Sequence, residues 1–160
     1  SHHVEMHRNK EWQEYWHIMA QKKFMEHYHK SIEEFINIFS GPMRNGLFKD
    51  RVDLIDRLRK ENKEVCVLSN LRQIDFEWFS TQYDISKFDN LYLSYKMHLM
   101  KPDDEIYREM IKDLGVSSNS IYFFDDNQAN VETAQKLGIN AYCVTGDTIK
   151  DLILREKLLK

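Results

Sequence analysis

The sequence predicts an α/β fold in which a doubly wound parallel sheet is joined to a small helical region. From residue 42 onward, short apolar runs alternate with amphipathic helical segments, as in a parallel sheet covered on both faces. Residues 10–40 show helical periodicity and no strand pattern. The 160 residues include only five Gly and two Pro, which favours long helices over a loop-rich fold.

The N-terminal quarter is expected to form two helices, 9–29 and 32–39. Apolar side chains recur there at spacings of three and four residues. The segment Ser31–Glu34 has the capping-box pattern, which predicts the start of the second helix. We therefore expect residues 4–41 to form a partial helical cap and residues 42–160 to form the α/β core.

Within the core, each expected strand is a short apolar run between helical segments, and we expect all four strands to lie in one parallel sheet. The expected strands are 65–68, 91–94, 121–124 and 141–144. The expected helices are 50–61, 71–80, 103–114, 129–137 and 147–159.

Composition and charge limit the kinds of partner. The net charge is −3, with both signs mixed along the chain and no basic patch, so nucleic acid is not an expected partner. No apolar run approaches 18 residues, and the first ten residues are polar, so neither a membrane span nor a signal peptide is expected. We expect a cytoplasmic protein that binds neither nucleic acid nor membranes.

The two cysteines do not predict a disulfide framework. Cys66 and Cys143 both lie inside apolar, strand-like runs of a chain with a sizeable core. We expect both to be buried free thiols in a reducing compartment. The histidines gather near the N-terminus with no cysteine beside them, so they do not predict a zinc site.

Polar side chains follow three successive expected strands. Ser69 and Asn70 follow the first strand, Lys101 comes a few residues after the second, and Asp125 and Asp126 follow the third. Ligands of doubly wound sheets bind outside the carboxyl ends of the strands, so these groups should converge on one edge. Taken alone, a Ser-Asn pair is typical of a turn or a helix cap, and a lone lysine is typical of a solvated surface. Two adjacent carboxylates are less easily explained in this way, because they repel each other unless a cation or hydrogen-bond donors neutralise them.

This combination of residue types suits phosphoryl transfer. Such catalysis consists mostly of positioning and of neutralising charge on the phosphate oxygens. A lysine supplies a compact positive charge, and a serine hydroxyl with nearby backbone N–H groups can hold phosphate oxygens. One or two carboxylates suffice for Mg²⁺, which keeps several of its waters. The sequence therefore indicates a magnesium-assisted reaction of a phosphate group.

Three segments together resemble the haloacid dehalogenase superfamily. They are Val65–Asn70, Met100–Tyr107 and Ile121–Asn130, and the resemblance spans roughly residues 42–146. It is greatest to the small-capped phosphatases, of the alpha-D-glucose-1-phosphate phosphatase and soluble epoxide hydrolase N-terminal domain types. The resemblance implies a Rossmann-like core with a small helical cap. It also implies an Mg²⁺-dependent phosphomonoesterase that acts on a small phosphorylated metabolite, such as a sugar phosphate.

The resemblance also implies roles for single residues. Ser69 would bind the phosphate, helped by Asn70. Lys101 would be catalytic, holding both the phosphate and the nucleophile, and Asn130 would brace this lysine.

The paired acids would form the metal site. Asp126 would ligate Mg²⁺ directly, with Asp125 beside it. Dehalogenases of the superfamily use no metal, so the pair favours a phosphatase over a dehalogenase.

One part of the family pattern has no counterpart in the sequence. The family's nucleophile is an Asp that follows the first strand, and it forms an aspartyl-phosphate. The first Asp of this chain is Asp50, in a helix pattern, and Asp147 and Asp151 lie in the last expected helix. We therefore expect the first, central strand and the nucleophile to be missing from the chain. That strand would lie between the strands 65–68 and 121–124.

Two functions remain open from the sequence. One is an active phosphatase whose nucleophile lies outside these residues. The other is an inactive, phosphatase-like protein that binds a phosphorylated ligand or a protein partner.

Overall fold

The structure is a computed structural model that describes residues 49–144 and 148–159. The expected cap, residues 4–41, and the expected domain boundary at residue 42 lie outside the described residues, and so do the expected helices 9–29 and 32–39.

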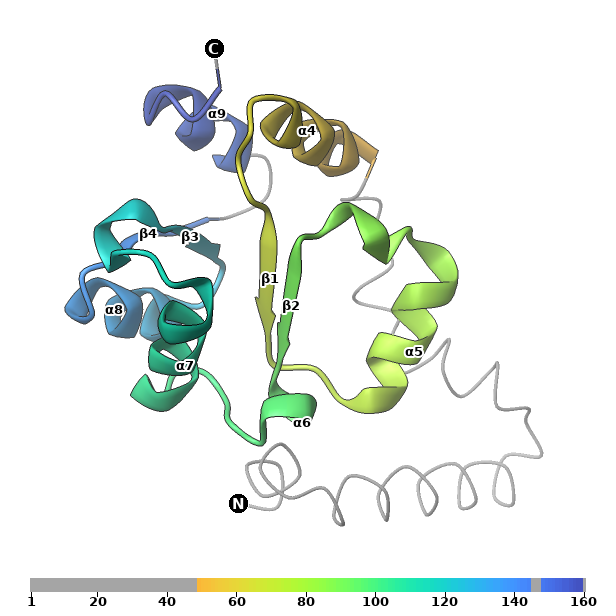
Figure 1. The fold of residues 1–160 in the computed structure, drawn as a ribbon, viewed down its shortest axis with the longest axis vertical. Helices are drawn as coiled ribbons and strands as arrows, with labels where there is room; N and C mark the ends of the chain where they lie inside the picture. The colour runs from red at the N-terminus through yellow and green to blue at the C-terminus, as the bar shows by residue number, and fades with distance from the viewer. Residues whose placement is uncertain (1–48, 145–147, 160) are drawn as a thin grey trace.

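The described elements alternate between helices and strands, as the sequence predicts (Figure 1). The strands are β1 (Cys66–Ser69), β2 (Asn90–Leu93), β3 (Tyr122–Asp125) and β4 (Asn140–Cys143). The helices are α4 (Lys49–Lys60), α5 (Gln73–Gln82), α6 (Ser94–Met97), α7 (Asp104–Leu114), α8 (Gln128–Lys136) and α9 (Thr148–Arg155), with short 3-10 turns at Ile85–Lys87 and Ser118–Ser120.

Most element ends differ from the predicted ones by no more than two residues. The exceptions are α9, which ends at Arg155 instead of residue 159, and α6, which was not predicted. Helix α6 begins at Ser94, immediately after β2, so the last residue of the expected strand 91–94 is helical. The apolar runs thus located the strands, whereas the pattern missed one short helix and the end of the last helix.

The strands form two parallel pairs. Strand β1 pairs with β2 from Cys66↔Asn90 to Ser69↔Leu93. Strand β3 pairs with β4 from Tyr122↔Asn140 to Asp125↔Cys143. The parallel direction is confirmed, but the expectation of one four-stranded sheet is wrong for the residues that the structure describes. The division falls between β1 and β3, where we expected the missing first strand of the family pattern to lie.

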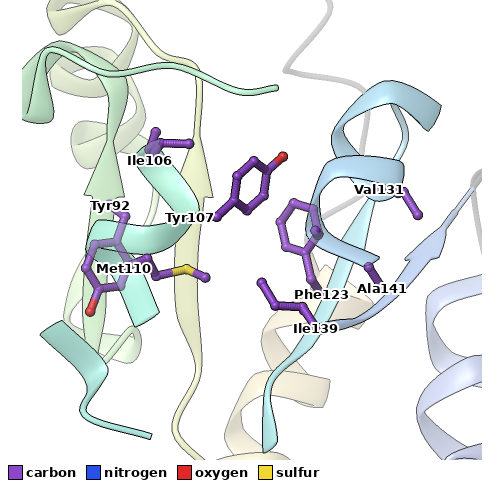
Figure 2. Packing of buried hydrophobic residues seen from close by; sticks show 9 residues of the cluster. Tyr92, Ile106, Tyr107, Met110, Phe123, Val131, Ile139 and Ala141 are labelled. Carbon is purple, nitrogen blue, oxygen red and sulfur yellow. The ribbon is translucent and has the colours of Figure 1, made fainter. Parts of the chain in front are cut away.

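Helix α7 joins the two strand pairs through the main hydrophobic core. Figure 2 shows this cluster, in which Ile106, Tyr107 and Met110 of α7 lie between Tyr92 of β2 and Phe123 of β3. Tyr107 and Ile106 are both fully buried, at 0% exposure. Burying side chains of this size stabilises a fold by roughly 1.5–3 kcal/mol each. The core therefore holds the two pairs in one arrangement although they share no ladder of backbone hydrogen bonds.

Strand β1 is less buried than its sequence predicts. All four of its residues are only half-buried, although Cys66, Val67 and Leu68 are apolar. Figure 1 shows β1 on the side of its pair that faces β3 and β4. Among the described residues, no strand pairs with that edge of β1, and an apolar edge of this kind is a surface that a neighbouring strand would cover.

The cysteines only partly follow the prediction. Both are free thiols, but Cys66 is half-buried and Cys143 is exposed, so the expected burial of both is wrong. Each lies in a pair of only two strands, and Cys143 is the last residue of β4. A two-stranded pair covers fewer side chains than the four-stranded sheet that we expected. Among the described residues, no helix has the length and apolar character needed to cross a membrane.

Candidate active site

The structure brings Lys101 and Asp125 into direct contact at the carboxyl ends of the strands. Asp125 is the last residue of β3, and Lys101 lies in the segment that follows α6. The Lys101 Nζ donates to Asp125 Oδ2 at 2.5 Å, and both side chains are buried, with 8% and 7% of their surfaces exposed. The convergence that the strand order predicted is therefore confirmed for these two groups.

Three donors hold the Asp125 carboxylate. Its Oδ2 accepts from Lys101, and its Oδ1 accepts from the backbone N–H of Asn127 at 2.8 Å and from Asn130 Nδ2 at 3.0 Å. A buried carboxylate is tolerated when a cation and hydrogen-bond donors compensate for its lost hydration. Asp126 is exposed instead. The adjacent acids thus avoid mutual repulsion because one is buried and neutralised while the other faces solvent.

Asn70 fixes the backbone of Lys101 to the end of β1. Its Nδ2 donates to the Lys101 carbonyl at 2.8 Å, and its Oδ1 accepts from the Lys101 N–H at 2.9 Å. The resemblance implied a role in phosphate binding, but the structure shows the side-chain amide of Asn70 binding the protein's own backbone. Ser94 makes a similar contact, because its Oγ accepts from the Leu71 N–H at 3.0 Å and donates to the Leu71 carbonyl at 3.1 Å.

Asn130 braces the lysine through a carboxylate. The resemblance implied that Asn130 acts on Lys101, whereas its amide donates to Asp125, which in turn holds the ammonium. The main-chain carbonyl of Asn130 accepts a hydrogen bond from the hydroxyl of Tyr107 at 2.9 Å. Burial raises the pKa of this hydroxyl well above its ordinary value, and the charge of Asp125 raises it further, so the hydroxyl stays a donor.

Ser69 and Asp126 lie at the same edge without joining this network. Ser69 ends β1, and its hydroxyl has no hydrogen-bond partner among the residues that the structure describes. Asp126 follows β3 directly, and among the described residues only its backbone carbonyl accepts a hydrogen bond, from the Cys143 thiol at 3.6 Å. A hydroxyl and a carboxylate are thus both available for a ligand. Ser69 ends β1 and Asp126 follows β3, so each lies at the carboxyl end of a strand, but no contact between them is present.

The donor set fits a magnesium ion on Asp126 better than on Asp125. Both oxygens of Asp125 already accept hydrogen bonds, whereas the carboxylate of Asp126 is exposed. Within residues 49–144 and 148–159, no group of three or more His, Cys, Asp or Glu side chains could hold a metal ion. Mg²⁺ needs only one or two carboxylates because it keeps its waters, so Asp126 can be one protein ligand of an incomplete set.

Two residues of this network were absent from the sequence prediction. Ser94 is the last residue of the second expected strand, 91–94, and its place at the strand end was a usable signal. Tyr107 lies on the apolar face of α7, where its spacing is that of any core residue. It ends the motif segment Met100–Tyr107, but the partner of its hydroxyl is far away in the sequence, so no local pattern assigns the hydroxyl a role.

Sequence similarity to known proteins extends over most of the chain. The family profile described as haloacid dehalogenase-like hydrolase matches residues 2–144. The D-ribitol-5-phosphate phosphatase of Bacteroides thetaiotaomicron is 33% identical over 99 residues, which are 58% of this chain and 48% of that protein. The sesquiterpene phosphatase of Aspergillus oryzae is 27% identical over 104 residues, which are 64% of this chain and 53% of that protein.

The chain is also similar in structure to a solved HAD family enzyme. The wild-type HAD family enzyme of Bacteroides thetaiotaomicron, crystallised with magnesium and inorganic phosphate, superposes with a TM-score of 0.57 at 32% identity. The match covers 61% of this chain and 52% of that one. The chain therefore spans about half the length of the curated phosphatases that it matches.

Proposed function

Since the chain belongs to the haloacid dehalogenase-like hydrolase family, we propose that it is an Mg²⁺-dependent phosphomonoesterase acting on a small phosphorylated metabolite. The observation that carries the proposal is the buried Lys101–Asp125 pair, with the exposed Asp126 next to it in sequence. An ammonium held in place at the carboxyl edge of the strands is ready to receive phosphate oxygens. The free thiols of Cys66 and Cys143 support a reducing compartment such as the cytoplasm.

Each polar group would act on the charge of the phosphate. Lys101 would bind one phosphate oxygen and orient the nucleophile, and the Ser69 hydroxyl would donate to another oxygen. Asp126 would hold the Mg²⁺, which neutralises negative charge on the phosphate when it is bound. Asp125, Asn70 and Asn130 would keep Lys101 in place without touching the substrate.

The nucleophile is proposed to be an Asp that is absent from these 160 residues, at the end of a strand between β1 and β3. Its carboxylate oxygen would attack phosphorus, and the alcohol of the substrate would leave. Water would then hydrolyse the aspartyl-phosphate to release inorganic phosphate and restore the carboxylate. The half-buried β1 and the separate strand pairs support this proposal. Asp56 of α4 is a poor substitute, because it forms an ion pair with Lys87 at 2.6 Å.

A binding protein without turnover is the second candidate. The observation that favours it is that none of the strand ends among the described residues offers an unpaired Asp besides Asp126, which comes after β3. Such a protein would bind inorganic phosphate with Mg²⁺ and would hydrolyse no phosphate ester.

The test is hydrolysis of p-nitrophenyl phosphate by the protein in its longest natural form, with Mg²⁺ and with EDTA. We expect turnover that EDTA abolishes, and we expect Lys101→Ala and Asp126→Asn each to lower kcat by about 100-fold or more. Asp53→Asn, on the exposed face of α4, is the matched control and should change little. D-ribitol 5-phosphate and a sesquiterpene phosphate then distinguish a polyol from a terpene substrate. Phosphate binding without any turnover would instead favour the second candidate.

A further inference from the structure

Tyr107 connects the hydrophobic core to the charged site. Its side chain is fully buried, at 0% exposure, yet it carries a hydroxyl that needs a partner. That partner is the Asn130 carbonyl in the first turn of α8, at 2.9 Å. Figure 2 shows the ring within the apolar cluster. The hydroxyl thus anchors the turn that also carries the amide of Asn130.

We propose that Tyr107 is a positioning residue for the Lys101–Asp125 pair, to which it is linked through Asn130. The link has three steps: Tyr107 fixes the main chain of Asn130, the Asn130 amide orients Asp125, and Asp125 holds the lysine ammonium. Each step is a hydrogen bond between groups that are buried from solvent, so the side chains have little freedom to drift. The expected effect on catalysis rests on the proposed function, but the positioning itself does not.

A second contact leads from Tyr107 to the same lysine. The ring of Tyr107 meets the ring of Phe123 edge-on, with centroids 5.8 Å apart. The Lys101 Nζ lies 5.5 Å from the centroid of that Phe123 ring. Cation–π contacts of this length are attractive. Tyr107 therefore contacts, directly or through Asn130, both groups that face the Lys101 ammonium: the Asp125 carboxylate and the Phe123 ring.

The first experiment compares Tyr107→Phe with Tyr92→Phe. Tyr92 belongs to the same core cluster, and its hydroxyl also makes one hydrogen bond, to Asp113 at 2.8 Å. The readout is the NMR order parameter of the Lys101 ammonium in the protein labelled with ¹⁵N-lysine. We expect it to fall in Tyr107→Phe and to stay unchanged in Tyr92→Phe, although both variants lose some stability. An unchanged value in Tyr107→Phe, or an equal fall in both variants, overturns the proposal.

Asn130→Ala provides a second variant in case Tyr107→Phe does not fold. The proposed link passes through the Asn130 amide, so its removal must also lower the order parameter of the Lys101 ammonium. A rigid ammonium in Asn130→Ala overturns the proposal. Replacing Tyr107 with 4-aminophenylalanine restores a donor at the same place and should restore the order of Lys101. Failure of this rescue means that the donor at this position does not set the order of Lys101, and it also overturns the proposal.

Kinetics give the functional readout. If the proposed phosphatase activity is present, Tyr107→Phe should lower kcat by about threefold to tenfold with little change in KM, because the lysine is misplaced mainly in the transition state. Tyr92→Phe should leave kcat unchanged. If the protein hydrolyses no phosphate ester, the proposed function fails, while the NMR comparison still decides the role of Tyr107.

Discussion

The two strand pairs hold their parts of the candidate site by different means. On the β3–β4 side, Asp125 is buried and held by an ammonium, a backbone N–H and an amide. On the β1–β2 side, the half-buried Asn70 makes two uncharged hydrogen bonds to backbone atoms. Lys101 belongs to both sides, since its backbone is bound to Asn70 and its side chain to Asp125. The β3–β4 strand pair thus holds the charged end of Lys101, and the β1–β2 strand pair holds the backbone of Lys101 through uncharged hydrogen bonds.

The largest expected effect comes from breaking the charged side. Asp125→Asn keeps the shape of the side chain but leaves the buried Lys101 ammonium without a counter-charge. Removing one partner of a buried ion pair destabilises proteins by about 3–5 kcal/mol. We expect a loss of this size in the free energy of unfolding measured with urea. Asp126→Asn, at the exposed neighbour, should change it by less than about 0.5 kcal/mol. Equal losses in the two variants would contradict the contrast between the paired and the exposed acid.

A smaller effect is expected from breaking the neutral side. Asn70→Ala removes two hydrogen bonds and should lower the free energy of unfolding by about 1–3 kcal/mol. The matched control is Asn140→Ala, because the Asn140 side chain also makes two hydrogen bonds to backbone groups. It donates to the carbonyls of Asn119 and Ile121, at 2.7 and 3.3 Å, but at the amino end of β4. Both variants should lose similar stability, but only Asn70→Ala should weaken the binding of inorganic phosphate in the presence of Mg²⁺, measured by calorimetry. Equal phosphate affinity in the two variants would show that Asn70 serves stability alone.

The smallest effect is a loss of stability at alkaline pH. Burial raises the pKa of Tyr92 on β2 and of Tyr107 beside the β3–β4 pair. Because the folded-state values lie above the unfolded value near 10, the stability from each neutral hydroxyl is fully present below that pH and decreases as the pH rises beyond it. We expect a loss of about 1 kcal/mol per tyrosine between pH 10 and 11. Each Tyr→Phe variant should remove its own share of this slope, and a slope unchanged in both variants would contradict the burial of the hydroxyls.

The fold was predictable where the signal was local. Four-residue apolar runs located the strands, and the order of polar residues after them predicted that Lys101 and Asp125 converge. The partner of Asn70 was not predictable, because an amide can bind a phosphate or a backbone equally well and the sequence does not show which lies near. Tyr107 could not be found for a related reason. Its spacing describes the face of the helix and gives no information about its hydroxyl.

The division into two strand pairs was only partly predictable from the sequence. The motifs predicted that the first strand is missing, whereas the parallel pattern alone predicted one continuous sheet. Sheet continuity depends on which strands are neighbours, and apolar runs carry no information about neighbours. The exposed Cys143 has the same origin, since a two-stranded pair covers fewer side chains than a complete sheet.

The bridge formed by Lys101 has a consequence for motion. It links the strand pairs at their carboxyl ends, where Ser69 and Asp125 lie. Among the described residues, no ion pair joins the amino ends of β1 and β3, which begin at Cys66 and Tyr122. We therefore expect any movement of one strand pair against the other to be smallest near the lysine and greatest at the opposite ends of β1 and β3. Backbone amides at those opposite ends should exchange with deuterium before the amides beside the lysine, so that the protein loosens from its far end while its reactive end keeps its shape.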